Sequence, residues 1–394
     1  MADLHWLNAT RVRVYPKIFL SLYAIIGLGA LWYWTHQPAF SGFIVSDLAV
    51  FWIAAHFSLS GHAVDAYLPE QLHQALSQIA PDIRGAYGWF YPPTFYLLIT
   101  PLGLLPYWGA YAAFMGVSLA GYVSVFRRIL PAKEAMWCLA AFPGLWINFL
   151  TGQNGMLTAA LAGAGLLALR KQPTLAGVLM GLLALKPHLA LLFPVALVAI
   201  GAWRTLVVAA VTALVFMGAG MIFLGTPTLD AWAQSLGLAR TIMEAGKTAP
   251  MMPTIFAMMR LLGAPLPLAY AMQVLMAATA TAVVWKVWRS GIPDELKGAA
   301  LMTATLLVSP YLMEYDLAWL GFPIAWVVQT GLQSGWMRAE REVLLAAWLL
   351  PLFTVVLAWL LRIQMGPWVI AALLWVVMRL VLATRTGGGL SHEA

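Results

Sequence analysis

Charge is scarce in this sequence, which is 62% hydrophobic and only 9% charged. A soluble domain carries about 25% charged residues, so the composition excludes an ordinary soluble protein. The single cysteine, Cys138, excludes an internal disulfide, and its apolar surroundings indicate inert packing. Internal repeats, low-complexity tracts and a soluble segment are also lacking, which favours one integral membrane domain over residues 1–394.

Long apolar runs take the place of the missing charge and recur from end to end. They are long enough to cross a hydrocarbon layer of about 30 Å as helices, and the alternating pattern of a β-barrel is not seen. We therefore predict an all-α, polytopic membrane protein with about 12 transmembrane helices. The first span shows no cleavage pattern and is expected to be a retained signal anchor. The expected spans are 18–34, 94–126 (with a kink near Pro101 or Pro106), 135–150, 155–169, 173–186, 188–202, 205–224, 265–284, 298–312, 316–331, 342–361 and 366–383.

The net charge of +7 comes from basic residues dispersed in short loops, so no nucleic-acid partner is expected. With the N-terminus in the cytoplasm, most of the 22 basic residues fall on the cytoplasmic side, as the positive-inside rule requires. An even number of spans places the C-terminus on that side too. The basic residues left on the outer side are Arg84, Lys186, Arg240, Lys247, Arg260 and Arg362.

Two long loops face outward in this topology, at residues 35–93 and 225–264. The first mixes apolar and polar positions in the way of helices that lie on a membrane surface. Its two expected interfacial helices run from Ser46 to a break at Gly61, and from after Pro69 to before Pro81.

Polar residues gather at the outer ends of the expected spans. An acid at the surface of so apolar a protein is costly, so Asp47 is a candidate functional residue. A one-sided group of acids, amides and cations beside apolar helices suits a substrate with a polar head and a lipid tail. The topology brings to this surface Asp47, Tyr91, Gln153, Asn154, Lys186, His188, Glu314, Tyr315 and Asp316.

Five short motifs follow one another in a recognisable order. They are Asp47 after the first span, Tyr91-Pro92-Pro93, Gly152-Gln153-Asn154, Lys186-Pro187 and Ser309-Pro310. This series resembles glycosyltransferase family 87, which comprises polyprenyl-phosphate-sugar-dependent glycosyltransferases of the C-type fold and includes bacterial mannosyltransferases. The resemblance extends over residues 40–320.

The resemblance implies an inverting sugar transfer, with mannose as the default, at the periplasmic or extracellular face of a bacterial cytoplasmic membrane. Asp47 would be the general base, which takes the proton of the acceptor hydroxyl as its oxygen attacks the anomeric carbon. The leaving lipid phosphate needs cations or hydrogen-bond donors. Our first candidates for this role are Lys186 and His188, and the further candidates are Arg240, Lys247, Arg260 and Arg362.

The expected partners are a polyprenyl-phosphate-linked sugar, a lipid or glycan acceptor, and membrane lipids. Tyr91, Gln153 and Asn154 are expected to bind substrate. Glu314, Tyr315 and Asp316 are also expected to bind substrate, and the two acids could orient an acceptor or hold a metal. Two acids without neighbouring ligands are weak grounds for a metal, so neither a metal nor a cofactor is expected.

Each role has a structural alternative. Asp47 could be a first-turn acid that complements a helix dipole, and Lys186 could extend from a helix end toward water. His188 could be a structural histidine, and Gly152 to Gly155 could form only a tight turn. For the whole chain, the alternatives are a transporter or flippase of a lipid-linked sugar, and a non-catalytic scaffold. A transporter places its polar site near the midplane, often between inverted repeats, whereas here the polar residues lie at outer helix ends.

Overall fold

The computed structural model describes residues 5–36, 46–79 and 87–385, and within these ranges the chain is helical and contains no strand. The predicted all-α class is therefore confirmed. The α-helices are α1 (Ala9–Thr35), α2 (Asp47–Leu59), α3 (Pro69–Ile79), α4 (Pro93–Ile99), α5 (Tyr107–Ile129), α6 (Lys133–Ala140), α7 (Pro143–Thr151), α8 (Gly155–Ala168), α9 (Pro173–Gly181), α10 (Leu192–Ala199), α11 (Trp203–Leu224), α12 (Pro227–Glu244), α13 (Ile255–Leu261), α14 (Leu266–Trp288), α15 (Asp294–Val308), α16 (Gly321–Ser334), α17 (Glu340–Leu361) and α18 (Gly366–Arg385). The 3₁₀ segments are η1 (Ala63–Tyr67), η2 (Thr100–Leu104), η3 (Leu182–Leu185), η4 (Pro187–Leu189), η5 (Ala249–Met251) and η6 (Glu314–Leu320).

In the described ranges, six helices are long and apolar enough to cross a membrane, namely α1, α5, α11, α14, α17 and α18. Large apolar side chains on them face outward, as lipid-facing residues do: Leu214 is 72% exposed and Ile222 is 81% exposed. The chain is therefore a membrane protein. The expected count of about 12 is not confirmed, because several expected spans fall on helices shorter than the roughly 20 residues that a crossing needs.

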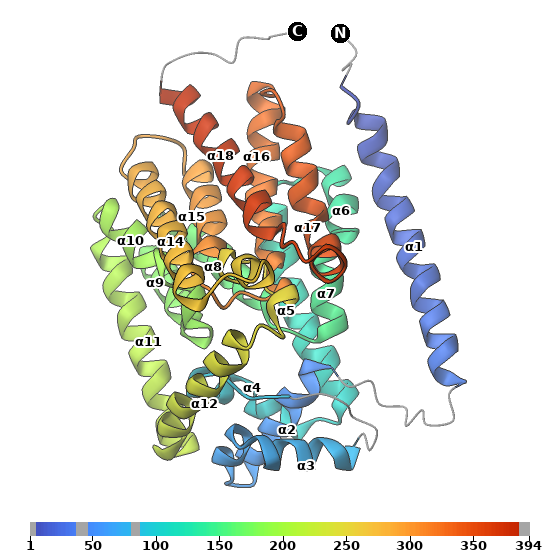
Figure 1. The fold of residues 1–394 in the computed structure, drawn as a ribbon. Helices are drawn as coiled ribbons and strands as arrows, with labels where there is room; N and C mark the ends of the chain where they lie inside the picture. Colours follow the sequence, from blue (N-terminus) through green and yellow to red (C-terminus); the bar gives the residue numbers. More distant parts are fainter. Residues whose placement is uncertain (1–4, 37–45, 80–86, 386–394) are drawn as a thin grey trace.

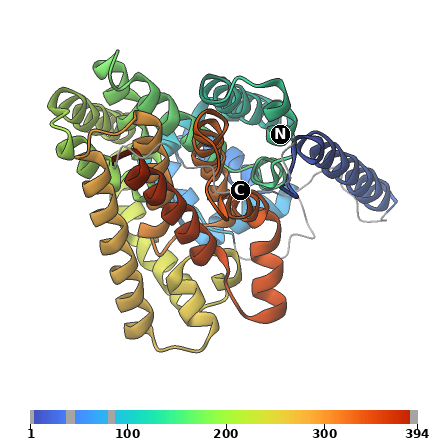
Figure 2. The same cartoon turned by 90° about the horizontal axis from the view of Figure 1, so that it is seen from above.

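Helix α1 stands to one side of the other helices in two perpendicular views (Figures 1 and 2). It packs mainly against α6, and Ile25, Leu28 and Trp32 on it are 66%, 67% and 65% exposed. An apolar helix with so little protein contact is stable where lipid covers it. At the centre, α15 packs against α14, α16 and α18, and its apolar side chains are buried on every side.

Prolines and one glycine end the helices at the places where polar residues gather. The residue before a proline favours extended backbone, and Lys186 before Pro187 has φ −143° and ψ 74°. Ser309 likewise leaves the helix, with ψ 133°, before Pro310. Gly152 ends α7 in the left-handed region at φ 66°, which glycine adopts without a steric penalty. Polar side chains are thereby placed at broken helix ends inside the bundle.

The first of the two loops expected to face outward contains α2 and α3 at the predicted residues, and Gly61 follows α2 with φ 79°. Pro81 and Arg84 lie outside the described residues. The second of these loops contains α12 and α13. Figure 1 shows α2, α3 and α12 at one end of the molecule, and the start of α1 and the end of α18 at the other.

Candidate active site

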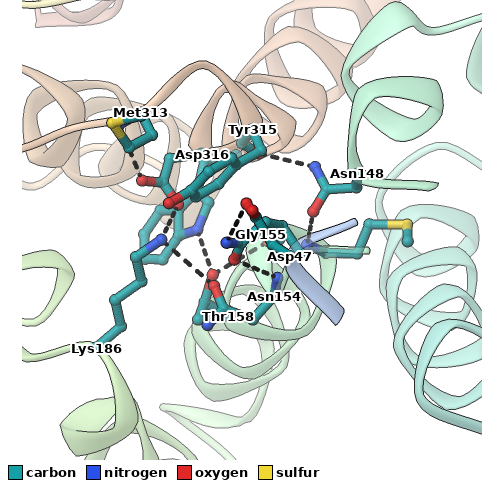
Figure 3. A network of polar contacts seen from close by, with 12 residues as sticks. Asp47, Asn148, Asn154, Gly155, Thr158, Lys186, Met313, Tyr315 and Asp316 are labelled. Atoms are coloured by element: carbon teal, nitrogen blue, oxygen red, sulfur yellow. Dashed lines mark hydrogen bonds and ion pairs between the residues drawn. The ribbon is translucent and has the colours of Figure 1, made fainter. Parts of the chain in front are cut away.

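Asp47 lies in the first turn of α2, and its carboxylate is oriented by an amide from a distant helix end. Gln153 Nε2 donates a hydrogen bond of 2.8 Å to Asp47 Oδ2. The other oxygen, Oδ1, accepts no hydrogen bond from the described residues, and the side chain is only partly buried. Figure 3 shows this carboxylate within a network of polar contacts. One carboxylate oxygen is therefore held in place by Gln153, and no described residue holds the other.

Gln153 is itself held by two hydrogen bonds to its side-chain oxygen. The hydroxyl of Tyr91 donates to Gln153 Oε1 at 2.9 Å, and the backbone N–H of Asn154 donates to the same atom at 3.2 Å. Because an amide oxygen only accepts, these contacts turn the NH₂ group toward Asp47. The backbone oxygen of Tyr91 accepts a 2.9 Å hydrogen bond from the Tyr67 hydroxyl, which fixes this tyrosine in turn.

Lys186 and Asp316 form a buried ion pair beside this amide. Lys186 Nζ lies 2.5 Å from Asp316 Oδ1 and donates a second hydrogen bond, of 3.3 Å, to Asn154 Oδ1. It also lies 4.6 Å from the centroid of the Tyr315 ring, in a cation–π contact. The side chains of Lys186 and Asp316 are 5% and 0% exposed. The network therefore joins residues that are far apart in the sequence at the broken ends of three helices (Figure 3).

Asn148 supports the network and was missed by sequence reasoning. Its Nδ2 donates to the backbone oxygens of Tyr315 at 2.7 Å and Gly144 at 2.9 Å. Its Oδ1 accepts from the backbone N–H of Met156 at 3.1 Å. A lone asparagine within the apolar run of α7 is costly unless it is hydrogen-bonded, and that signal could have identified it.

Burial makes two of the acids at the site, Asp47 and Glu314, more basic than ordinary carboxylates. It raises the pKa of Asp47, although the Gln153 hydrogen bond and the charge of Lys186 oppose the change. Burial also raises the pKa of Glu314 to about 7, and the nearby Asp47 and Asp316 add to this effect. Glu314 is 6% exposed, and its Oε2 has no hydrogen-bond partner among the described residues. Neither acid lies in one of the six candidate spans.

His188 lies beside the network without joining it. Its ring faces Tyr311 edge-on with a centroid distance of 6.2 Å, and its buried Nε2 has no partner in the described part of the chain. Burial, with help from the charge of Lys186, lowers the pKa of His188 to about 3. The imidazole is therefore neutral at physiological pH and can offer a hydrogen bond to a phosphate but no charge.

Arg240 and Arg260 lie in a second cluster, on α12 and α13. Arg240 Nε donates to Glu244 Oε1 at 2.7 Å. Arg260 donates to the backbone oxygens of Ala264 at 2.6 Å and Glu244 at 3.3 Å. Neither arginine contacts the Asp47 network in the described part of the chain. Tyr311, which precedes η6, packs against the neighbouring apolar cluster that includes Met243 and Phe256. Their role at a phosphate stays a prediction.

A metal site requires several ligating side chains gathered at one place. No group of three or more His, Cys, Asp or Glu side chains in these ranges could hold a metal ion. The groups that are assembled are an oriented carboxylate, amides, an ammonium and a protonatable acid. Such a set can accept a proton, donate hydrogen bonds and stabilise a negative charge.

The fold and the site define an α-helical membrane protein with an oriented carboxylate among broken helix ends. The family model of glycosyltransferase family 87 matches residues 89–310, which is more than half of the chain. The chain therefore belongs to this family, as its motifs indicated, and is a glycosyltransferase. The matched range includes Tyr91, Gln153 and Lys186, whereas Asp47 precedes it. Comparisons with curated proteins and with solved structures found no match.

Proposed function

We propose that this glycosyltransferase moves a sugar from a polyprenyl-phosphate donor to a lipid or glycan acceptor, with inversion at the anomeric carbon. The reaction takes place at the outer face of a bacterial cytoplasmic membrane, and mannose is the default sugar. Asp47 is the general base. The observation that carries the proposal is the oriented carboxylate of Asp47, with one oxygen held by Gln153 and the other without a partner among the described residues.

The proposed step needs only the groups at this site. The hydroxyl oxygen of the acceptor forms a bond to the anomeric carbon while its proton passes to Asp47 Oδ1. The bond from the anomeric carbon to the donor phosphate breaks, and the polyprenyl phosphate leaves with the electron pair. A raised pKa makes Asp47 a better base for a proton that is acidic only in the transition state.

The leaving phosphate is stabilised by the donors next to Asp47. An ammonium group has three N–H donors, and two of those of Lys186 donate hydrogen bonds to Asp316 and Asn154. Its third N–H is available for a phosphate oxygen. Since Asp316 already balances the charge of Lys186, Glu314 can assist by donating a hydrogen bond when it is protonated.

Sugar transfer in membranes that contain the wild type or Asp47→Asn tests this role. The substrates are labelled polyprenyl-phosphate sugars and a cell-envelope lipid extract. We expect the variant to lose about 10²–10⁴-fold in rate, which is the usual contribution of a general base. Glu70→Gln is the matched control, because Glu70 is also a first-turn acid but lies exposed on α3. It should keep the wild-type rate.

Equal transfer by Asp47→Asn and the wild type would remove Asp47 from the mechanism. Equal losses in Asp47→Asn and Glu70→Gln would favour the helix-dipole role of both acids over catalysis. If the protein instead moved intact donor across vesicles without forming a product, the transporter alternative would replace the proposed transfer.

A further inference from the structure

A cavity of about 450 Å³ lies at the other end of the bundle from Asp47. It is formed by the last turns of α8 and α14 and the first turns of α9, α11 and α15. Helix α8 runs from Gly155, next to the active site, to Ala168 near this cavity. Its 14 residues rise about 21 Å at 1.5 Å per residue. The cavity is therefore separate from the candidate active site, and it falls within the usual range of ligand pockets, about 300–1,000 Å³.

Positive charge exceeds negative charge around this cavity. Arg170, Arg204 and Lys297 line it, and Asp294 is the acid among the lining residues. Arg170 Nη2 donates to Asp294 Oδ1 at 2.7 Å, so these two charges balance. Arg204 and Lys297 form no ion pair among the described residues, although the charge of Asp294 also acts on Lys297.

Lys297 is the most informative of these residues. Its side chain is 8% exposed, yet its ammonium group makes no hydrogen bond to any residue in the described ranges. Trp288 Nε1 donates to its backbone oxygen at 3.0 Å, which fixes the position of this lysine. The stem of Lys297 is therefore covered by protein while its ammonium group reaches the cavity, where it places a positive charge that an anion can neutralise.

Helix dipoles add to the positive potential. The first turns of α9, α11 and α15 all border the cavity, and the free N–H groups at the start of a helix favour an anion. Asp294 occupies the first turn of α15 and offsets one of these three helix ends. The other two helix starts hold no acidic residue in their first turn.

The rim of the cavity is apolar and exposed. Ile200 and Trp203 line it and are 40% and 59% exposed. A tryptophan that is exposed beside basic residues at the end of membrane helices is typical of the membrane–water interface. A free phosphate would gain nothing from this rim, whereas a lipid would place its acyl chains against it.

We propose that this cavity binds the phosphate of an anionic membrane lipid, with Lys297 and Arg204 as the charged contacts and Ile200 and Trp203 beside the acyl chains. Basic cavities between membrane helices are suited to such headgroups. The site lies at the end that the basic loops predict to be cytoplasmic, so it is distinct from the site of sugar transfer.

Lipid titrations of the purified protein in neutral detergent test the proposal. The probes are dioleoylphosphatidylglycerol, dioleoylphosphatidylcholine and inorganic phosphate, and the readout is the melting temperature. We expect the anionic lipid to raise the wild-type melting temperature more than the zwitterionic lipid does. Lys297→Met and Arg204→Gln should each need about five- to tenfold more anionic lipid for the half-maximal shift. Arg289→Gln is the control, since Arg289 is exposed at the same end but does not line the cavity.

Wild-type titrations from both cavity variants would overturn the proposal, as would an equal loss in Arg289→Gln. Arg204 is exposed, so its variant keeps the test decisive if Lys297→Met folds poorly. Inorganic phosphate that raises the melting temperature equally and blocks the lipid effect would overturn the assignment to a lipid.

Discussion

The ion pair of Lys186 and Asp316 is the most deeply buried charged part of the polar network. Both side chains are almost fully buried, and each has a second polar contact. Asp316 Oδ2 accepts a hydrogen bond of 3.2 Å from the backbone N–H of Met313, so the carboxylate is satisfied on both oxygens. Removal of either partner leaves an uncompensated charge in a dry environment, which is the costly case for a buried pair.

The first prediction concerns this pair. Lys186→Met should lower the free energy of unfolding by about 3–5 kcal/mol, the usual result of breaking a buried pair. The double variant Lys186→Met with Asp316→Leu should recover much of the loss, because no buried charge is then left alone. Unfolding in mixed micelles measures the stability of both variants.

The control is Arg240→Gln, which breaks an exposed ion pair and should leave the melting temperature unchanged. Equal losses in Lys186→Met and Arg240→Gln would show that the pair is not buried in the folded protein.

The second prediction concerns the buried carboxyl of Glu314, whose pKa burial raises from 4.5 to about 7. The folded state binds this proton more tightly than the unfolded chain does. The free energy of unfolding therefore falls as the pH rises between these two values, by about 3 kcal/mol at most. Glu314→Gln resembles the protonated form and should remove this fall. It should be more stable than the wild type at pH 8 and no more stable at pH 4.

Melting temperatures across this pH range provide the measurement for Glu314. Glu295→Gln is a suitable control, because Glu295 is an exposed acid at the start of α15 and should leave the pH profile of the protein as it is. A Glu314→Gln profile parallel to that of the wild type would mean that Glu314 is ionised at low cost in the folded state.

At the scale of elements, the site depends on the close approach of α8 to η6. Gly155 begins α8, and a Cβ atom there would lie 2.3 Å from the backbone oxygen of Tyr315 and 2.8 Å from Asn148 Oδ1. Neither neighbour can move easily, since Asn148 donates its own hydrogen bond to that same Tyr315 oxygen. A side chain at Gly155 would therefore separate the element that carries Gln153 from the one that carries Asp316.

The third prediction follows from this contact. Gly155→Ala should lower both stability and sugar transfer by separating α8 from η6, even though alanine favours helices by about 1 kcal/mol over glycine. Gly116→Ala is the matched control, because Gly116 lies within α5 with no atom near its Cβ position. It should be neutral or slightly stabilising. Melting temperature and transfer rate measure both variants, and wild-type behaviour of Gly155→Ala would show that the two elements can separate without loss.

The same elements show what the sequence can and cannot predict. Hydropathy located the helices, and each motif residue was placed at a helix end because Pro187, Pro310 and Gly152 end helices by local sterics. Hydropathy did not predict that α6 and α7 are separate helices, because the break at Ala141 and Phe142 is as apolar as its surroundings; Pro143, which begins α7, is the local signal that marks this break. The topology predicted that the polar residues lie close together at one membrane face; the structure brings most of them into one network, and the face stays a prediction.

Pairings within that surface required the structure. Lys186 was expected to meet a phosphate, and the structure gives it Asp316, which is 130 residues away, as a partner. No local pattern specifies a contact over such a separation, because it depends on how α9 and α15 pack within the bundle. Gln153 as the group that orients Asp47 likewise depends on the packing of α2 against the end of α7.

At the scale of the whole molecule, the charge pattern and the fold point to one orientation. The start of α1 and the end of α18 lie at the same end of the molecule (Figure 1). The first turns of α11 and α15, with Arg204 and Lys297, border the cavity toward that end. Helices α2, α3 and α12 lie at the opposite end. An excess of basic residues at one end marks the cytoplasmic side of a membrane protein, so the α3 end is expected outside.

The final prediction tests this orientation with single cysteines in a chain that carries Cys138→Ala. Gln74→Cys places a thiol on an exposed position of α3, and Lys171→Cys places one in the exposed turn between α8 and α9. A membrane-impermeant maleimide added to intact cells should label the first variant and not the second. Both should react once the membrane is opened, which controls for burial of either thiol. Labelling of the Lys171 position alone in intact cells would reverse the orientation. It would also move sugar transfer at Asp47 to the cytoplasmic face, because Asp47 and Gln74 lie on neighbouring helices that pack against each other.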